Sequence, residues 1–247
     1  MSAIFRAYND WLAEFCRTDP ARLKGIATIN LDDVEDGIKE LELAARLGLS
    51  GAMITEYPLE HRRYDGSEYE PFWAAAAALD LPLSLHTATR RQGRIRGAGD
   101  KTLRDASSRA TKAFYPALSL CDLIFSGVFE RHPRLTLAIV EFELAWAPHL
   151  FSTMDYTYRE RHGEAIYRFK DCVLPSDFFR RNVVLSFQGG RHRHSPARRL
   201  RCRQHDVGLG LSGQRVDISP IAQDPGRGAG RRTGQDRRRQ HRQRVQF

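Results

Sequence analysis

The sequence predicts an α/β fold in which the strands of a parallel sheet alternate with helices. Short apolar segments of strand length recur along the chain, and segments with the helical spacing of apolar residues separate them. Such alternation is typical of a parallel sheet with helices packed outside it. The pattern does not distinguish an open sheet from a closed barrel. The predicted strands are residues 23–31, 50–54, 81–87, 135–142 and 182–187.

Helices are predicted from apolar spacing and from residues that start or stop a helix. Asp32 is the predicted N-cap of one helix, and Gly48 is its predicted C′ residue. Pro71 suits the first turn of the next helix, and Pro116 is predicted to kink a longer one. No G-x-G-x-x-G or Walker A pattern follows a strand, which argues against a nucleotide-binding fold. The predicted helices are residues 3–16, 34–47, 71–79, 107–129 and 148–161.

His86 is the first candidate functional residue because it ends a predicted strand. That strand (LPLSLHT) is apolar at Leu81, Leu83 and Leu85. In a barrel, the carboxyl ends of the strands point into the catalytic mouth. A neutral imidazole there is a natural ligand for a divalent transition metal. The alternative is a histidine that is only hydrogen bonded at the strand end, since one histidine is not a ligand set.

A polar loop, residues 89–104, follows this strand and carries six basic residues and three glycines. Loops of this length in a compact domain are usually lids or binding loops, or else mobile. Arg90, Arg91, Arg94 and Arg96 are therefore candidates to hold a substrate carboxylate. Solvated surface charge is the alternative for these arginines.

Composition favours a cytoplasmic protein with reduced thiols. The sequence has no apolar run of about 18 residues, which a membrane-spanning helix needs. Its first residues lack the basic and apolar regions of a secretory signal. The cysteines are widely spaced and form no C-x-x-C pair, so neither a disulfide framework nor structural zinc is expected. They are Cys16, Cys121, Cys172 and Cys202.

The net charge of +9 comes entirely from the last 59 residues. Residues 189–247 contain 15 arginines and four aspartates, whereas residues 1–188 carry 24 basic and 26 acidic side chains. The last 59 residues also lack the apolar content that folding requires. We predict a globular body, residues 1–188, and a disordered Arg-rich tail, residues 189–247. The arginines would attract nucleic acid nonspecifically, although no interleaved aromatic residues support a dedicated role.

Five stretches of the body form a specific combination: YNDWLAEFC, RLKGIATINL, PFWAAAAALDLPLSLHT, FERHPRLTLAIVEFELAWAPH and MDYTYRERHG. Through them, residues 4–188 resemble the amidohydrolase-related family, the metal-dependent hydrolases and decarboxylases that share a (β/α)8 barrel. The resemblance implies a partial (β/α)8 TIM barrel that contains about strands three to seven.

The resemblance also implies a metal site. The strand that ends at His86 looks like the fifth barrel strand, and His86 matches the family's metal-ligand histidine. The next strand looks like the sixth, where many relatives carry a second histidine and this sequence has Glu141. Glu141 is therefore a candidate metal ligand and a candidate catalytic acid–base. The alternative is that Glu141 and Glu143 only support the ligands. The implied cofactor is a divalent metal ion, zinc or similar.

Two family features are missing from the sequence. It begins at what resembles the helix before strand three, so the Asp-x-His or Glu-x-His pair of strand one is absent. The aspartate of strand eight is also absent in frame. A shifted reading of codons that can encode residues 203–213 yields Ser-Asp-Tyr-Pro, which is similar to the family's strand eight. We therefore expect truncation at the amino terminus and a frameshift after about residue 188. An unclosed barrel exposes strand edges, and we expect such a chain to be unstable.

Four functional hypotheses follow from the sequence. The first is a metal-dependent hydrolase of the amidohydrolase-related family that acts on a small molecule. The second is a metal-dependent decarboxylase of the same family. The third is an inactive gene remnant, because usual ligand positions are absent. The fourth is nonspecific binding of nucleic acid by the tail. The implied partner is a small-molecule substrate, with no membrane association and with a homo-oligomer left open.

Overall fold

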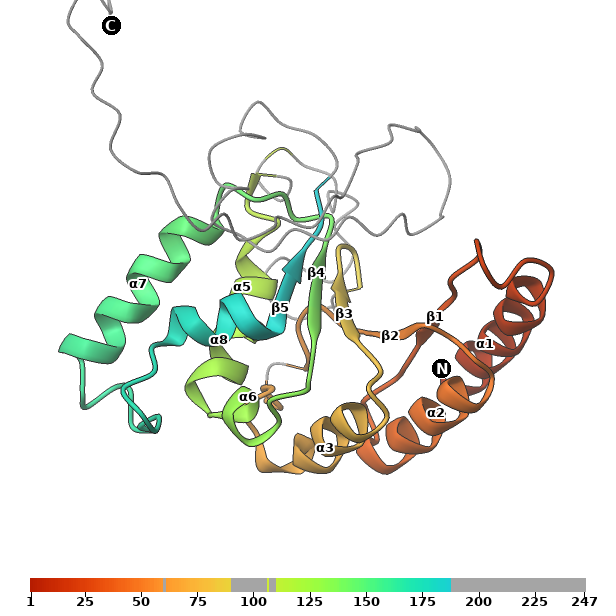
Figure 1. The fold of residues 1–247 in the computed structure, drawn as a ribbon, viewed down its shortest axis with the longest axis horizontal. Coiled ribbons are helices and arrows are strands. Elements are labelled where there is room, and N and C mark those ends of the chain that lie inside the picture. The colour runs from red at the N-terminus through yellow and green to blue at the C-terminus, as the bar shows by residue number, and fades with distance from the viewer. Residues whose placement is uncertain (60, 90–105, 107–109, 188–247) are drawn as a thin grey trace, which may run out of the picture. The chain divides into compact units, whose positions relative to one another are not determined.

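The computed structural model describes residues 1–59, 61–89, 106 and 110–187, and all of them belong to one compact unit. The predicted α/β class is confirmed, because five parallel strands form one sheet and helices connect them (Figure 1).

Two predicted regions lie outside the described residues. They are the Arg-rich tail, residues 189–247, and nearly all of the polar loop after His86. The disorder of the tail, its affinity for nucleic acid, the frameshift and the body's boundary at residue 188 therefore stay predictions.

The sheet follows the order of the chain, and every neighbouring pair of strands is parallel. All five predicted strands are present, although each is shorter than predicted. The strands are β1 Ile26–Thr28, β2 Gly51–Ile54, β3 Leu83–His86, β4 Leu137–Val140 and β5 Val183–Leu185. Within the described ranges, β1 and β5 each pair with one strand only, so they form the two edges of the sheet.

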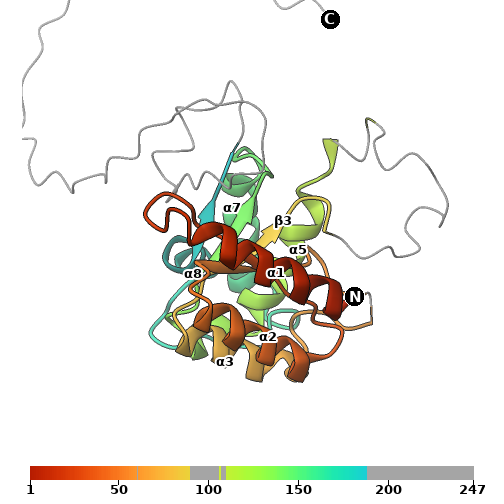
Figure 2. The ribbon, with the colours of Figure 1, turned by 90° about the vertical axis from the view of Figure 1, so that its right-hand side faces the viewer.

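The helices alternate with the strands as predicted. They are α1 Ser2–Cys16, α2 Val34–Arg46, α3 Glu70–Ala78, α5 Phe114–Phe125, α6 Val128–Arg131, α7 Ala147–Glu160 and α8 Pro175–Asn182, with a 3-10 turn η1 Ser67–Tyr69 before α3. Figure 2 shows α1 and α2 running next to each other, where the Arg6 guanidinium of α1 donates to the Glu40 carboxylate of α2. None of the helices in these ranges is long and apolar enough to cross a membrane.

Two helix predictions were wrong in detail. The N-cap of α2 is Asp33 rather than Asp32, and its carboxylate accepts the backbone N–H of Asp36 at 2.9 Å. The predicted long helix at residues 107–129 is divided, because α5 ends before Gly127, which has a φ of +78°. Pro116 produces no kink because it lies in the first turn of α5, where its missing N–H has no helical acceptor.

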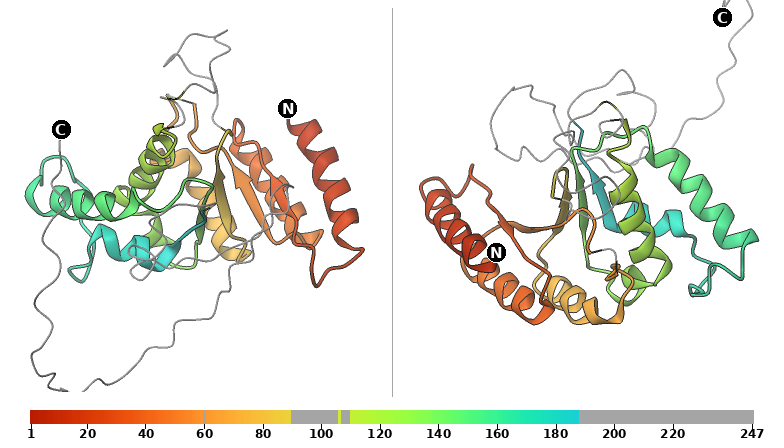
Figure 3. Two further views of the ribbon diagram at one scale, coloured as in Figure 1. Left: turned by 90° about the horizontal axis from the view of Figure 1, so that it is seen from above. Right: turned by 180° about the vertical axis from the view of Figure 1, so that it is seen from behind.

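The two faces of the sheet differ in burial. One face carries alternate strand residues that are almost fully buried among the helix side chains, and they include Ala27, Ala52, Leu83, Leu137 and Val183. Helix α5 covers this face, since it lies behind the sheet in Figure 1 and in front of it in the right view of Figure 3. Residues of the opposite face are half-buried, and they include Thr28, Met53, Ser84, His86, Ala138 and Val184. We call this second side the open face.

Side chains tie the elements together at the amino end of the sheet, where the strands begin. The Glu70 carboxylate at the start of α3 accepts two bonds from the Arg131 guanidinium, at 2.7 and 2.8 Å. The same carboxylate lies 2.8 Å from His132 Nε2. The Arg131 hydrogen bonds lower the pKa of Glu70 to about 2 against the opposing effect of burial, and His132 adds to the lowering. This cluster joins α3 to α6 before β4 begins.

Candidate active site at the carboxyl ends of the strands

The structure brings the two predicted ligand residues together. His86 is the last residue of β3 and pairs in register with Val140, the last residue of β4, so Glu141 follows directly beside His86. His86 Nε2 and Glu141 Oε1 are 3.8 Å apart, and both side chains are partly exposed. Neighbouring strand ends therefore place the two candidate residues side by side, and their roles in metal binding stay predictions.

A backbone hydrogen bond sets the orientation of the His86 ring. His86 Nδ1 lies 2.8 Å from the carbonyl oxygen of Thr87. A carbonyl can only accept, so Nδ1 carries the hydrogen and Nε2 presents its lone pair in a neutral ring. That lone pair then faces the Glu141 carboxylate, which is also an acceptor. Two acceptors in this position favour a cation or a hydrogen-bond donor between them.

The spacing of the two groups suits one shared metal ion. Imidazole nitrogen and carboxylate oxygen bind zinc at about 2.0 to 2.2 Å, which puts two ligand atoms about 3.5 Å apart at a tetrahedral angle. The observed 3.8 Å is close to this value. A divalent ion between His86 and Glu141 therefore requires only a small adjustment of either side chain.

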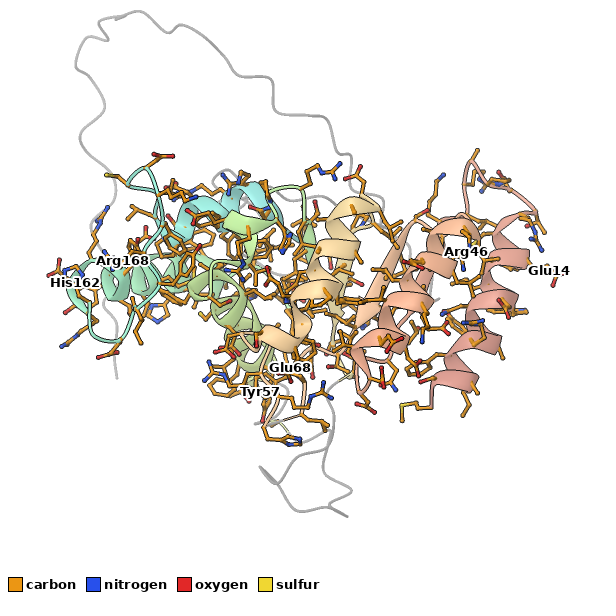
Figure 4. All side chains as sticks on the ribbon, turned by 90° about the horizontal axis from the view of Figure 1, so that it is seen from below. Glu14, Arg46, Tyr57, Glu68, His162 and Arg168 are labelled. Atoms are coloured by element: carbon orange, nitrogen blue, oxygen red, sulfur yellow. The ribbon has the colours of Figure 1, made fainter. Side chains whose placement is uncertain are left out.

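The described residues supply two ligands and no complete set. Among them, no group of three or more histidine, cysteine, aspartate or glutamate side chains converges as a metal site does. His132 is engaged with Glu70 at the amino end of the sheet. His162 lies near Arg168 in Figure 4, at the far end from Glu14 and Arg46 of the first two helices. A catalytic ion usually has three protein ligands, so an ion bound here would need at least one further ligand from beyond the described residues.

The backbone changes direction sharply after β4. Glu141 has a φ of +70° and Glu143 has a φ of +61°. Residues other than glycine rarely adopt this backbone conformation. The Glu141 N–H donates to Ser186 Oγ at 2.9 Å, and Lys112 Nζ donates to the Glu141 carbonyl at 2.7 Å. Lys112 Nζ also lies 3.7 Å from Glu143 Oε1.

Further hydrogen bonds attach the end of β3 to its neighbours. The Thr89 hydroxyl donates to the His86 carbonyl at 2.7 Å and accepts the Glu56 N–H at 2.8 Å. The Ser119 hydroxyl of α5 donates to the Glu56 carbonyl at 2.8 Å. These bonds join β3 to the segment after β2 and to α5, so the backbone that carries His86 is held from two sides.

Three residues that hydrogen bond to the backbone of Glu141 or His86 were not predicted from the sequence as parts of the site: Lys112, Ser186 and Thr89. Ser186 had a usable signal, because it lies near the end of a predicted strand just as Glu141 does. Lys112 had none, since it lies within the predicted helix at residues 107–129 and has no fixed spacing from any strand. Arg90 and Arg91, and likewise Arg94 and Arg96, lie outside the described residues, so their role in substrate binding stays a prediction.

A small cavity lies beside this site but does not include it. It is a narrow hollow next to the ends of β1 and β2, and its empty volume of about 250 Å³ includes open solvent. Its lining residues are Leu31, Asp32, Thr55, Pro58, Leu59, Arg62, Tyr64 and Tyr69. The buried Tyr64 hydroxyl in its lining donates to the Thr55 carbonyl and so stabilises the fold.

A protein-family model matches most of the chain. The model of the family described as "Amidohydrolase" matches residues 1–200. A curated relative, the gamma-resorcylate decarboxylase of Polaromonas sp., is 31% identical over 54% of this chain and 43% of its own length. The chain therefore spans less than half the length of that relative.

Two solved structures of similar fold are decarboxylases. The 5-carboxyvanillate decarboxylase of Sphingomonas paucimobilis is 25% identical and has a TM-score of 0.62, covering 74% of this chain and 54% of that one. A dihydroxybenzoic acid decarboxylase of Polaromonas sp., with bound manganese and the inhibitor 2-nitroresorcinol, is 25% identical and has a TM-score of 0.56. That match covers 76% of this chain and 57% of the other.

Proposed function

The chain belongs to the amidohydrolase family, and from this premise we propose that its chemistry is metal-dependent decarboxylation of a small aromatic carboxylic acid. The single observation that carries the proposal is the placement of His86 and Glu141. The lone pair of His86 Nε2 faces the Glu141 carboxylate at 3.8 Å, a spacing that suits a shared divalent ion.

Decarboxylation replaces hydrolysis as the first hypothesis. The sequence analysis placed a hydrolase first and a decarboxylase second. The curated relative and both solved structures named above are decarboxylases, which favours the second hypothesis. The manganese in one of them supports a divalent ion here and gives manganese preference over the zinc that we first expected.

The proposed mechanism assigns roles to residues of this chain. His86 would hold the ion through Nε2, with the Nδ1–H bond to Thr87 fixing the ring. The bound ion would supply positive charge to orient and polarise an anionic substrate. In the reaction the bond between the ring carbon and the carboxylate breaks, carbon dioxide leaves, and the ring carbon takes up a proton. Two roles are open to Glu141: second ligand to the ion, or the group that delivers this proton from its carboxyl oxygen.

Metal content and reaction product test the proposal together. We expect the 247-residue chain, purified without chelator and incubated with Mn²⁺, to retain the ion, and His86→Ala to lose at least about tenfold in affinity. His149→Ala is the matched control, because His149 is exposed on α7. Carbon dioxide release from 2,6-dihydroxybenzoate or 5-carboxyvanillate would identify decarboxylation. Mn²⁺ retention that is equal in parent and His86→Ala would contradict the site.

An inactive gene remnant is the second candidate, and one observation favours it. The described residues bring only two potential ligands together, and two ligands hold an ion weakly. Resequencing the gene across codons 180–250 tests this idea. A corrected frame that encodes Ser-Asp-Tyr-Pro would supply the missing aspartate, whereas a confirmed frame would leave the site incomplete.

A further inference from the structure

The backbone at Glu141 breaks the alternation of β4, and this break places its carboxylate. Residues 137 and 139 of β4 point toward the helices, so continued alternation would send residue 141 to the same side. His86 lies on the opposite, open face. The φ of +70° at Glu141 ends the alternation and lets the carboxylate reach 3.8 Å from His86 Nε2.

This conformation is unfavourable for a glutamate, yet both adjoining peptide groups are held by side chains from other parts of the chain. Ser186 Oγ, just after β5, accepts the Glu141 N–H. Lys112 Nζ, just before α5, donates to the Glu141 carbonyl. Strained backbone persists only where its surroundings stabilise it. The hydrogen bonds with Ser186 and Lys112 provide this stabilisation at Glu141.

We propose that Lys112 and Ser186 are positioning residues that hold Glu141 in its left-handed conformation and so direct its carboxylate toward His86. The consequence for metal binding rests on the proposed function, whereas the consequence for the backbone does not.

Lys112 is suited to this role by charge and reach. An ammonium group forms charge-assisted hydrogen bonds, which are stronger than neutral ones, and its 2.7 Å bond to the Glu141 carbonyl is of this kind. The same ammonium lies 3.7 Å from the carboxylate of Glu143, the second residue with positive φ. One side chain thus contacts both residues with positive φ, at the backbone of Glu141 and at the side chain of Glu143. A methionine of similar length has no N–H to donate, whereas an arginine retains the charge and the donors.

Ser186 is suited because its own backbone is fixed. Its N–H donates to the Ile139 carbonyl of β4 at 3.0 Å, so its hydroxyl stands at a set distance from the end of β4. Ser186 also follows Val184 by two residues, which places it on the open face together with His86.

Amide hydrogen exchange at Glu141, measured by NMR on the 247-residue chain without metal, tests the positioning directly. We expect exchange about tenfold faster in Lys112→Met and in Ser186→Ala, as for the loss of one hydrogen bond. Lys112→Arg should restore slow exchange, and Lys39→Met, at an exposed lysine of α2, should change nothing. Exchange at Leu85 should stay constant in all variants, which separates local loosening from unfolding. Unchanged exchange at Glu141 in Lys112→Met and Ser186→Ala would overturn the proposal.

Mn²⁺ affinity of the same variants adds a readout that general stability does not move. We expect affinity about tenfold weaker in Lys112→Met, as for other residues that orient a ligand, and recovery in Lys112→Arg. If the variants show faster exchange at Glu141 but the parent protein binds no Mn²⁺, the positioning role is supported and the metal site is rejected. Weaker Mn²⁺ binding in Lys112→Met without faster exchange would support the metal site and reject the positioning role.

Discussion

The two ends of the sheet use unusual backbone for different purposes. At the amino end, positive φ angles occur at Gly48, Asp80 and Gly127, each directly after the C-cap of a helix. That position commonly adopts the left-handed conformation and simply ends the helix. At the carboxyl end, positive φ occurs at Ala88 after β3 and at Glu141 and Glu143 after β4, and none of these residues terminates a helix.

Side-chain bonding differs between the ends in the same way. At the amino end, side chains bond to one another and to strand backbone in fixed pairs, as Glu70 does with Arg131. At the carboxyl end, His86 and Glu141 present acceptors to each other with no hydrogen between them in the neutral ring. The side chains at the amino end thus bond to one another and stabilise the fold, whereas at the carboxyl end two acceptors face each other where we propose that an ion binds. Each of the following substitutions should affect one end and leave the other unchanged.

The largest expected loss of stability is at the amino end, in Asn182→Ala. The buried Asn182 amide donates to the carbonyls of Pro133 and Leu135, at 3.1 and 2.8 Å, just before β4 begins. Alanine leaves both carbonyls without this donor, and we expect unfolding in urea to show a loss of about 2 to 3 kcal/mol. Ser152→Ala, at an exposed serine of α7, is the control and should stay within about 0.5 kcal/mol. If Asn182→Ala loses less than about 0.5 kcal/mol, the amino end does not stabilise the fold as described.

A smaller, pH-dependent loss is expected for Glu70→Gln. The folded-state pKa of Glu70 is lowered from 4.5 to about 2, first by the Arg131 hydrogen bonds. A carboxyl group whose pKa is lower in the folded protein contributes stability at pH values above its pKa in the unfolded chain. This contribution disappears as the pH falls through its pKa in the folded protein. The carboxylate is partly exposed, so we expect the parent to exceed Glu70→Gln by about 1 kcal/mol at pH 6.

The pH series itself provides the check on Glu70. The difference between parent and Glu70→Gln in thermal or urea unfolding should shrink between pH 4.5 and pH 2. A difference that stays constant across this interval would show that the ionised carboxylate is not its source. Mn²⁺ affinity at pH 6 should be the same in both proteins, since Glu70 lies at the other end of the sheet.

The smallest change in the free energy of unfolding is expected for Glu141→Gly, and it is a gain rather than a loss. Glycine adopts a φ of +70° without steric cost, so we expect a gain of about 0.5 to 1 kcal/mol in stability together with weaker Mn²⁺ binding. Glu42→Gly, at an exposed position inside α2, is the matched control and should lose about 1 kcal/mol. Destabilisation of the same size in both variants would remove the evidence for strain at Glu141.

Much of the fold could be predicted from the sequence because strands and helices differ in local pattern. Apolar runs located all five strands, and the strand ends located His86 and Glu141. The split of the predicted helix at residues 107–129 and the shift of the cap from Asp32 to Asp33 were not predicted, since neighbouring residues offer similar local signals and packing selects between them.

The sequence by itself determined which residues end the strands, and parallel pairing then made His86 and Glu141 neighbours. Only the tertiary structure decided which way the Glu141 carboxylate points. That direction depends on a left-handed backbone held by Lys112 and Ser186, and these residues lie 29 and 45 positions away along the chain. Local sequence encodes the alternation of a strand, but an exception to the alternation is stabilised by contacts that exist only after the chain has folded.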